Sequence, residues 1–140
     1  MNAAHHVIRH RLVLELVGPE HPTPLDAELR YDPADPFAVA MAFLKDGHEV
    51  VWVFARDLLL RGITQPAGVG DVHVFPSIDA DGRAVVAIGL RGPTGEALLE
   101  GRTRDFLSFL GQTTRAVWPG TERDSGLSLD SAIAEFLVGD

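Results

Sequence analysis

The chain has 140 residues and a mass of 15.1 kDa, and its composition of 46% hydrophobic and 23% charged residues is ordinary for a globular protein. We therefore expect residues 1–140 to form a single domain. The absence of cysteine excludes disulfides, Cys-ligated zinc, iron–sulfur clusters and thiol catalysis. The formal net charge of −8 disfavours binding to nucleic acid or anionic lipid that is mainly electrostatic.

No segment has the length and hydropathy of a signal peptide or a bilayer span. The most apolar stretch, residues 50–60, is interrupted by Arg56 and Asp57 and is far shorter than the roughly 20 residues that cross a membrane. We expect a cytoplasmic protein without direct membrane insertion, so any membrane location would depend on a partner.

Residues 5–17 and 25–31 have the period of two that half-buried strands require, with Leu12, Leu14 and Leu16 on one face of the first and Leu25, Ala27, Leu29 and Tyr31 on one face of the second. The expected strands cover residues 5–17, 25–31, 37–44 and 48–55. Asp46-Gly47 predicts a tight hairpin, because glycine accepts a positive φ. The strand at 48–55 is apolar on both faces, so we expect it to lie centrally, covered on both sides, or to face a subunit contact.

The middle of the chain predicts a short helix and a second meander. The helix covers residues 56–61 and is stopped at Gly62. Residues 65–70 form a Pro/Gly loop, and strands are expected at 71–77, 83–90 and 96–99, separated by turns at 79–82 and 92–95.

The period then changes to that of a helix. Thr103 is expected to cap this helix, with Asp105 in its first turn, and Pro119-Gly120 ends it. Its buried face is expected to contain Phe106, Phe109, Leu110, Thr113 and Val117. A last helix is expected at 130–138. Strands followed by helices indicate an α+β fold, with antiparallel sheets of about seven strands and C-terminal helices packed on them.

Residues with catalytic or ligating chemistry do not form a recognisable motif. The histidines lack metal-ligand spacing, no serine lies in G-x-S-x-G, and Gly68-Val69-Gly70 precedes a strand rather than a helix. The acidic pairs Asp32/Asp35 and Asp79/Asp81 lie in turns, where aspartate is favoured for its backbone bonding. We expect no catalytic residue, cofactor or metal, and therefore no enzyme.

Large aromatic side chains are the remaining candidates for function. Most should lie in the core, but a subset exposed in one patch would form the hot spot of a protein interface. The candidate partner-binding residues are Trp118, Phe75 and Trp52. Trp118 lies beside a helix end and Pro119-Gly120, so we expect it to be the most exposed of them.

Four collinear segments together resemble a known family. They read ELRYDPADPFAV (28–39), VWVFARDLL (51–59), PAGVGDVHVFP (66–76) and GEALLE (95–100). In this order and spacing they resemble the SsgA-like sporulation and cell division proteins of morphologically complex actinobacteria, the SsgB type most of all. Val51 departs from the family pattern, since members often carry Glu there, and Phe75 stands where Trp is frequent.

This resemblance implies a non-enzymatic developmental regulator of sporulation-specific division. It implies that the chain recruits FtsZ to septum sites, with an SsgA-type protein as a further partner and a homotrimer as the assembly. The implied fold is similar to that of the Whirly and mitochondrial guide-RNA-binding proteins, with two antiparallel sheets and packed helices.

The kinship with these fold relatives raises the alternative of a single-stranded nucleic-acid-binding module. Such modules combine a basic groove with stacking aromatic side chains. Here 12 basic residues are scattered among 20 acidic ones, without a basic run. The composition therefore disfavours nucleic acid as the partner.

Overall fold

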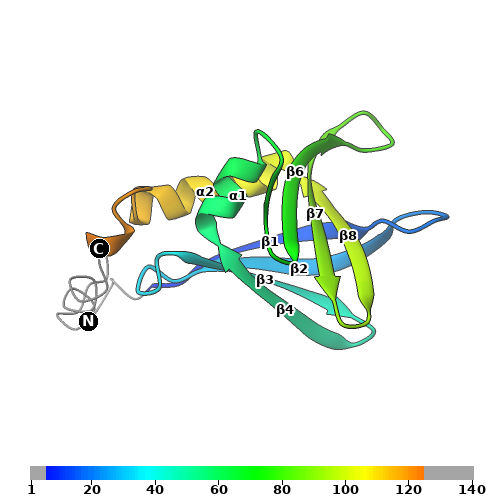
Figure 1. Cartoon of the computed structure of the whole chain (residues 1–140), viewed down its shortest axis with the longest axis horizontal. Helices are drawn as coiled ribbons and strands as arrows, with labels where there is room; N and C mark the ends of the chain where they lie inside the picture. Colours follow the sequence, from blue (N-terminus) through cyan, green and yellow to red (C-terminus); the bar gives the residue numbers. More distant parts are fainter. Residues whose placement is uncertain (1–5, 125–140) are drawn as a thin grey trace.

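The structure, a computed structural model, describes residues 6–124 and confirms the α+β class. A sheet of eight antiparallel strands is combined with two α-helices and a short 3-10 helix (Figure 1). The strands are β1 (Ile8–Leu16), β2 (Thr23–Tyr31), β3 (Ala38–Lys45), β4 (His48–Ala55), β5 (Ala67–Val69), β6 (Val72–Ile78), β7 (Ala84–Gly92) and β8 (Gly95–Arg102). The helices are α1 (Arg56–Gly62), α2 (Thr103–Ala116) and the 3-10 helix Glu122–Asp124.

The sheet has the order β4-β3-β2-β1-β8-β7-β6-β5, so two four-stranded meanders are joined through β1 and β8. That junction is short: Glu15↔Glu100 and Leu16↔Leu99 are paired across it, and the Val17 N–H donates to the Leu98 carbonyl oxygen at 2.9 Å. The two sheets that the family resemblance implied are therefore two halves of one continuous, curled sheet (Figure 1). The eighth strand, β5, lies within the expected loop at 65–70.

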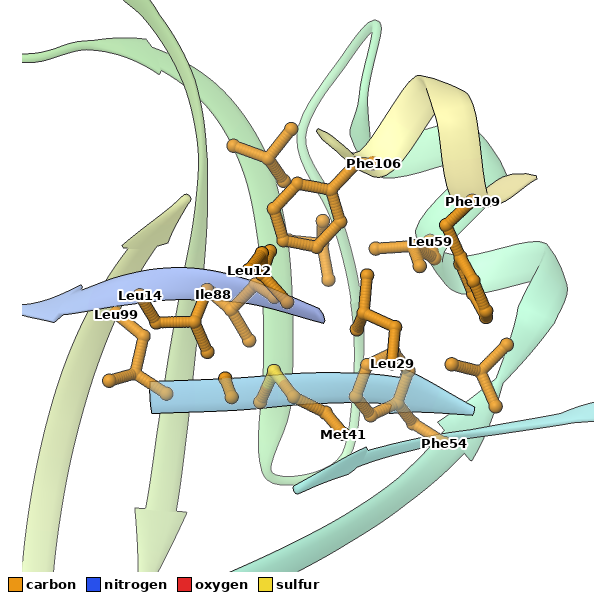
Figure 2. Packing of buried hydrophobic residues seen from close by; sticks show 14 of the residues in the cluster. Leu12, Leu14, Leu29, Met41, Phe54, Leu59, Ile88, Leu99, Phe106 and Phe109 are labelled. Carbon is orange, nitrogen blue, oxygen red and sulfur yellow. The ribbon is translucent and has the colours of Figure 1, made fainter. Parts of the chain in front are cut away.

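The inner face of the curled sheet forms the core with the two helices (Figure 2). The strands contribute every second residue, such as Leu12 and Leu14 of β1 and Met41 of β3. The predicted face of α2 is confirmed, since Phe106, Phe109, Leu110 and Thr113 are buried and Val117 is buried just beyond the helix. Burial of these apolar side chains is the main source of stability.

Two predictions about helix ends are wrong. Thr103 does not cap α2: Arg102 occupies the N-cap position, no side-chain capping bond is present, and Thr103 is the first helical residue. Gly62 does not stop α1 from outside, because it is the last helical residue and is buried. A Cβ at Gly62 would overlap Cγ1 of Val74, so glycine is needed there for the close approach of α1 to β6.

Of the two alternatives expected for residues 48–55, the central, covered strand is wrong, and the subunit contact stays a prediction. Among the described strands, β4 lies at one edge of the sheet. The position of β4 in the sheet is decided by the strand order. The apolar sequence of β4 shows how much apolar surface the strand carries, but not where in the sheet the strand lies. The expected helix at 130–138 lies outside the described residues.

Candidate partner-binding surface

Ionisable side chains of the described residues form ion pairs and small surface groups, such as Arg9, Glu28, Arg30 and Glu49. Within residues 6–124, no group of three or more His, Asp or Glu side chains is arranged to hold a metal ion. His10 Nε2 lies 3.1 Å from Asp105 Oδ1, which links β1 to the first turn of α2. Asp79 accepts bonds from the backbone N–H groups of Asp81 and Arg83, both at 2.9 Å, and the bond from Arg83 is the main reason why the pKa of Asp79 is lowered.

The three candidate aromatic residues lie on different surfaces. Trp118 follows α2 and is 67% exposed, which confirms the expected exposure. Trp52 is half-buried on the inner face of β4, beside the β7–β8 hairpin. Phe75 is half-buried on the outer face of β6, opposite Ala87 of β7. Trp118 is therefore the candidate with the most accessible ring.

The backbone that carries Trp118 is anchored by a buried arginine. Arg56, the first residue of α1, is fully buried. Its Nη1 atom donates to the carbonyl oxygens of Thr113 (3.1 Å) and Val117 (2.7 Å), and its Nη2 atom pairs with Glu122 Oε2 at 2.8 Å. These carbonyls lie at the C-terminal end of α2, where the helix leaves acceptors unsatisfied and favours positive charge.

Arg56 also contacts Tyr31, whose ring centroid lies 5.0 Å from the guanidinium carbon. The Tyr31 hydroxyl donates to the carbonyl oxygen of Pro36 at 2.9 Å, and burial raises the pKa of Tyr31 to about 12. The hydrogen bond from Arg56 lowers the pKa of Glu122. This network, from Tyr31 through Arg56 to Glu122, is named the Arg56 clamp below.

The turn after α2 is held by its own hydrogen bonds as well. The N–H and Oγ1 of Thr121 both donate to the carbonyl oxygen of Trp118, at 2.9 and 2.6 Å. The N–H of Gly120 donates to Glu122 Oε1 at 2.9 Å, which ties the turn to the Arg56 clamp. The backbone at Trp118 is thus fixed while its ring faces solvent, and such preorganisation reduces the entropy lost on binding.

A second exposed aromatic residue flanks the clamp. The N–H of Arg56 donates to the carbonyl oxygen of Phe37 at 2.7 Å, and Phe37 is 52% exposed. One residue of α1 therefore bonds to the backbone beside both exposed rings. Phe37 and Trp118, held by the Arg56 clamp, are named the aromatic end below.

Sequence reasoning missed both Phe37 and the role of Arg56. The available signal was the position of Arg56 within the apolar stretch 50–60, since a lone arginine in such a stretch needs buried acceptors. Its acceptors lie 57, 61 and 66 residues further along the chain, so local sequence does not reveal them. Phe37 lay inside a predicted strand, and nothing local distinguished it from core residues.

The fold and the aromatic end define a small α+β protein built on a curled antiparallel sheet, with two exposed aromatic side chains beside backbone that Arg56 anchors. The family described as Streptomyces sporulation and cell division protein, SsgA, matches residues 25–122. The chain belongs to this SsgA family of sporulation and cell division proteins, and the SsgB-type members are relatives that it resembles in sequence and in fold.

The individual comparisons agree with this assignment. The sporulation-specific cell division protein SsgB of Streptomyces coelicolor is 48% identical over 124 residues, which are 88% of this chain and 89% of that protein. SsgB of Frankia casuarinae is 42% identical, covering 99% of this chain and 97% of its own. These relatives support a role in sporulation cell division.

Solved structures show the same fold. One, from work on SsgB mutations that correlate with longitudinal cell division during sporulation of Streptomyces coelicolor, superposes with a TM-score of 0.82 at 46% identity and covers 89% of this chain and 98% of its own. An SsgA-like sporulation-specific cell division protein from Thermobifida fusca gives 0.82 at 36% identity, covering 97% and 99%. Neither helix in residues 6–124 has the length and hydropathy needed to traverse a bilayer.

Proposed function

We propose that this protein is a non-enzymatic adaptor of sporulation-specific division, which acts in the cytoplasm at division septum sites and recruits FtsZ through direct protein contacts. The observation that carries the proposal is the exposure of Trp118, a residue that is 67% exposed and follows backbone held by the Arg56 clamp. Exposed tryptophans on preorganised backbone are typical anchors of protein interfaces. The names of the relatives supply the process, sporulation cell division.

Oligomerisation would strengthen such a contact. We propose that the chain forms a homotrimer, so that three copies of the aromatic end engage one FtsZ polymer. Linked weak sites gain avidity without new contacts where the geometry allows simultaneous engagement. Sedimentation equilibrium tests the assembly: the expected mass is about three times 15.1 kDa, and the mass of a single chain would remove avidity from the proposal.

An SsgA-type protein is the second partner in the proposal.

Nucleic acid is not proposed, because two of the arginines on the outer face of β1 and β2 are already paired with carboxylates. Arg9 pairs with Glu28 at 3.1 Å, and Arg30 pairs with Glu28 at 2.6 Å and with Glu49 at 2.8 Å. Binding to a single-stranded oligonucleotide at low salt, without binding to FtsZ, would favour the alternative instead.

Co-sedimentation with FtsZ polymers tests the recruitment. We expect the wild-type chain to pellet with the polymers and Trp118→Ala to weaken binding about 30-fold, the effect of losing a hot spot of about 2 kcal/mol. Leu107→Ala is the matched control, because Leu107 is also a large exposed side chain of the α2 region, 52% exposed, and lies outside the aromatic end. Failure of the wild type to pellet would contradict FtsZ recruitment, and equal pelleting of Trp118→Ala would contradict the assigned surface.

A further inference from the structure

The two edges of the sheet differ in how they are protected. β5 has three residues, follows Pro66 and packs beside α1, and these features discourage pairing with a further strand. β4 has eight residues, and from Val50 to Ala55 its sequence contains no charge, proline or glycine. Exposed edges of this kind are ready templates for strand addition.

The hairpin register shows which peptide groups of β4 are free. The turn Asp46-Gly47 has φ values of 54° and 79°, as in a two-residue type I′ turn, and Lys45 pairs with His48 across it. The peptide groups of the even-numbered residues of β4 therefore bond to β3. The bond from the Arg56 N–H to the Phe37 carbonyl oxygen continues this pattern by one more even-numbered residue. The peptide groups of Glu49, Val51 and Val53 face the open edge.

The side chains beside these free groups are exposed and apolar. Val53 is 63% exposed and Val51 is 46% exposed, both on the outer face of the sheet. Leu44 of β3, paired with Glu49, is 50% exposed on the same face. A strand added to β4 would therefore cover apolar surface as well as satisfy backbone groups.

The inner face offers a pocket at the same edge. It has a volume of about 440 Å³ and lies between β4 and the β7–β8 hairpin, which approach each other in Figure 1. Val50 and Trp52 line it from β4, and Leu90 and Ala97 line it from the hairpin. Alternate residues of an added strand would reach this pocket, because successive side chains point to opposite faces.

The charges around this edge are balanced within the chain. Lys45 Nζ lies 3.6 Å from Asp46 Oδ2, and Glu49 pairs with Arg30 at 2.8 Å. At the rim of the pocket, Arg91 Nε lies 3.2 Å from Glu96 Oε2. A charged partner segment would find no unpaired counter-charge among these groups, so the complementary segment is an uncharged one.

We propose that the free edge of β4 binds an extended, uncharged, apolar segment of another protein, which adds to the sheet as a ninth strand. Its backbone bonds to Glu49, Val51 and Val53, one set of side chains packs on the two valines, and the other set enters the pocket beside Trp52. These residues are not among those of the aromatic end, so the proposal gives the adaptor a second contact for a second partner. The inference does not depend on the identity of FtsZ as the first.

Amide exchange measured by NMR tests the proposal with a capped peptide, GSVTVTVSG, as the probe. At a peptide concentration that occupies about nine-tenths of the chains, we expect exchange at Glu49, Val51 and Val53 to slow about tenfold. The amides of Val50 and Trp52 already bond to β3 and should change little. Trp118→Ala should bind the peptide normally, which separates this result from that of FtsZ recruitment.

Two substitutions provide matched controls. Val53→Lys places a charge at the edge and should abolish the slowing, whereas Val13→Lys, at a valine 51% exposed on the outer face of the interior strand β1, should preserve it. No slowing in the wild-type chain at millimolar peptide, or slowing that Val53→Lys leaves intact, would overturn the proposal. Slowing at the same three amides that grows with protein concentration alone would also overturn it, because a second copy would then be the occupant.

Discussion

Arg56 and Val53 are three residues apart in the chain and have opposite environments. Arg56 is fully buried, and both of its terminal guanidinium nitrogens are bonded, Nη1 to two carbonyl oxygens and Nη2 to a carboxylate. At Val53 the peptide group faces an open edge and the side chain is 63% exposed. The comparison separates the start of α1, where a buried side chain stabilises the fold, from the strand before it, where the edge remains exposed.

The largest effect is expected from removing the clamp. Arg56→Ala removes the guanidinium donors of the Thr113 and Val117 carbonyls and of Glu122 Oε2, and it leaves a cavity beside Tyr31. Thr113 and Glu122 then keep the bonds from the N–H groups of Val117 and Gly120, respectively. We expect the free energy of unfolding, measured in urea, to fall by about 3–5 kcal/mol. Arg61→Ala is the control, because Arg61 pairs with Asp57 on the exposed side of α1 and should contribute less than about 1 kcal/mol. A similar small loss for both would show that the clamp does not stabilise the helix end.

A smaller loss is expected from crowding the same end. In Gly62→Ala the new methyl group meets Val74, so α1 must shift from β6, at a cost of about 1–3 kcal/mol. Gly111→Ala is the matched control within α2, where the nearest atom is Arg115 Nη1 at 3.6 Å and the added methyl should stabilise the helix by about 0.5–1 kcal/mol. Both free energies of unfolding can be measured by thermal or urea unfolding. If Gly62→Ala stabilised the fold and Gly111→Ala destabilised it, the close approach at Gly62 would be contradicted.

The clamp also predicts a pH dependence. Because Arg56 lowers the pKa of Glu122 in the folded chain, this carboxylate stabilises the fold above its unfolded pKa, about 4.3, and the contribution is lost as the pH falls through the folded value. Glu122→Gln should cost about 1 kcal/mol at pH 7. The difference between the two proteins should shrink as the pH is lowered from 5 toward about 3. A difference that stays constant over this range would mean that the Glu122 charge is not coupled to folding.

The same contrast explains which features could be predicted from sequence. Seven strands could be predicted because alternation and turn residues such as Asp46-Gly47 are local properties, and Trp118 was expected to be exposed because the helix end and Pro119 are adjacent to it. The edge position of β4 was missed, since it depends on the pairing of β1 with β8 across some 80 residues of chain. Arg56 was missed for the same reason, as its acceptors come from the far end of α2. Contacts between residues far apart in the chain therefore decide both the exposure of the β4 edge and the burial of Arg56.

The smallest effect is expected at the open edge. Val53→Thr exchanges a methyl for a hydroxyl that water can reach, so the free energy of unfolding should change by less than about 0.5 kcal/mol. The same exchange at Val74, fully buried on the inner face of β6, places a hydroxyl among apolar atoms and should cost about 1–3 kcal/mol. If Val53→Thr were as costly as Val74→Thr, Val53 would be covered in the folded protein, and the contrast between the clamp and the open edge would fail. If only Val74→Thr is costly, the Val53 side chain contributes little to folding and is accessible in the folded protein, as strand addition at this edge requires.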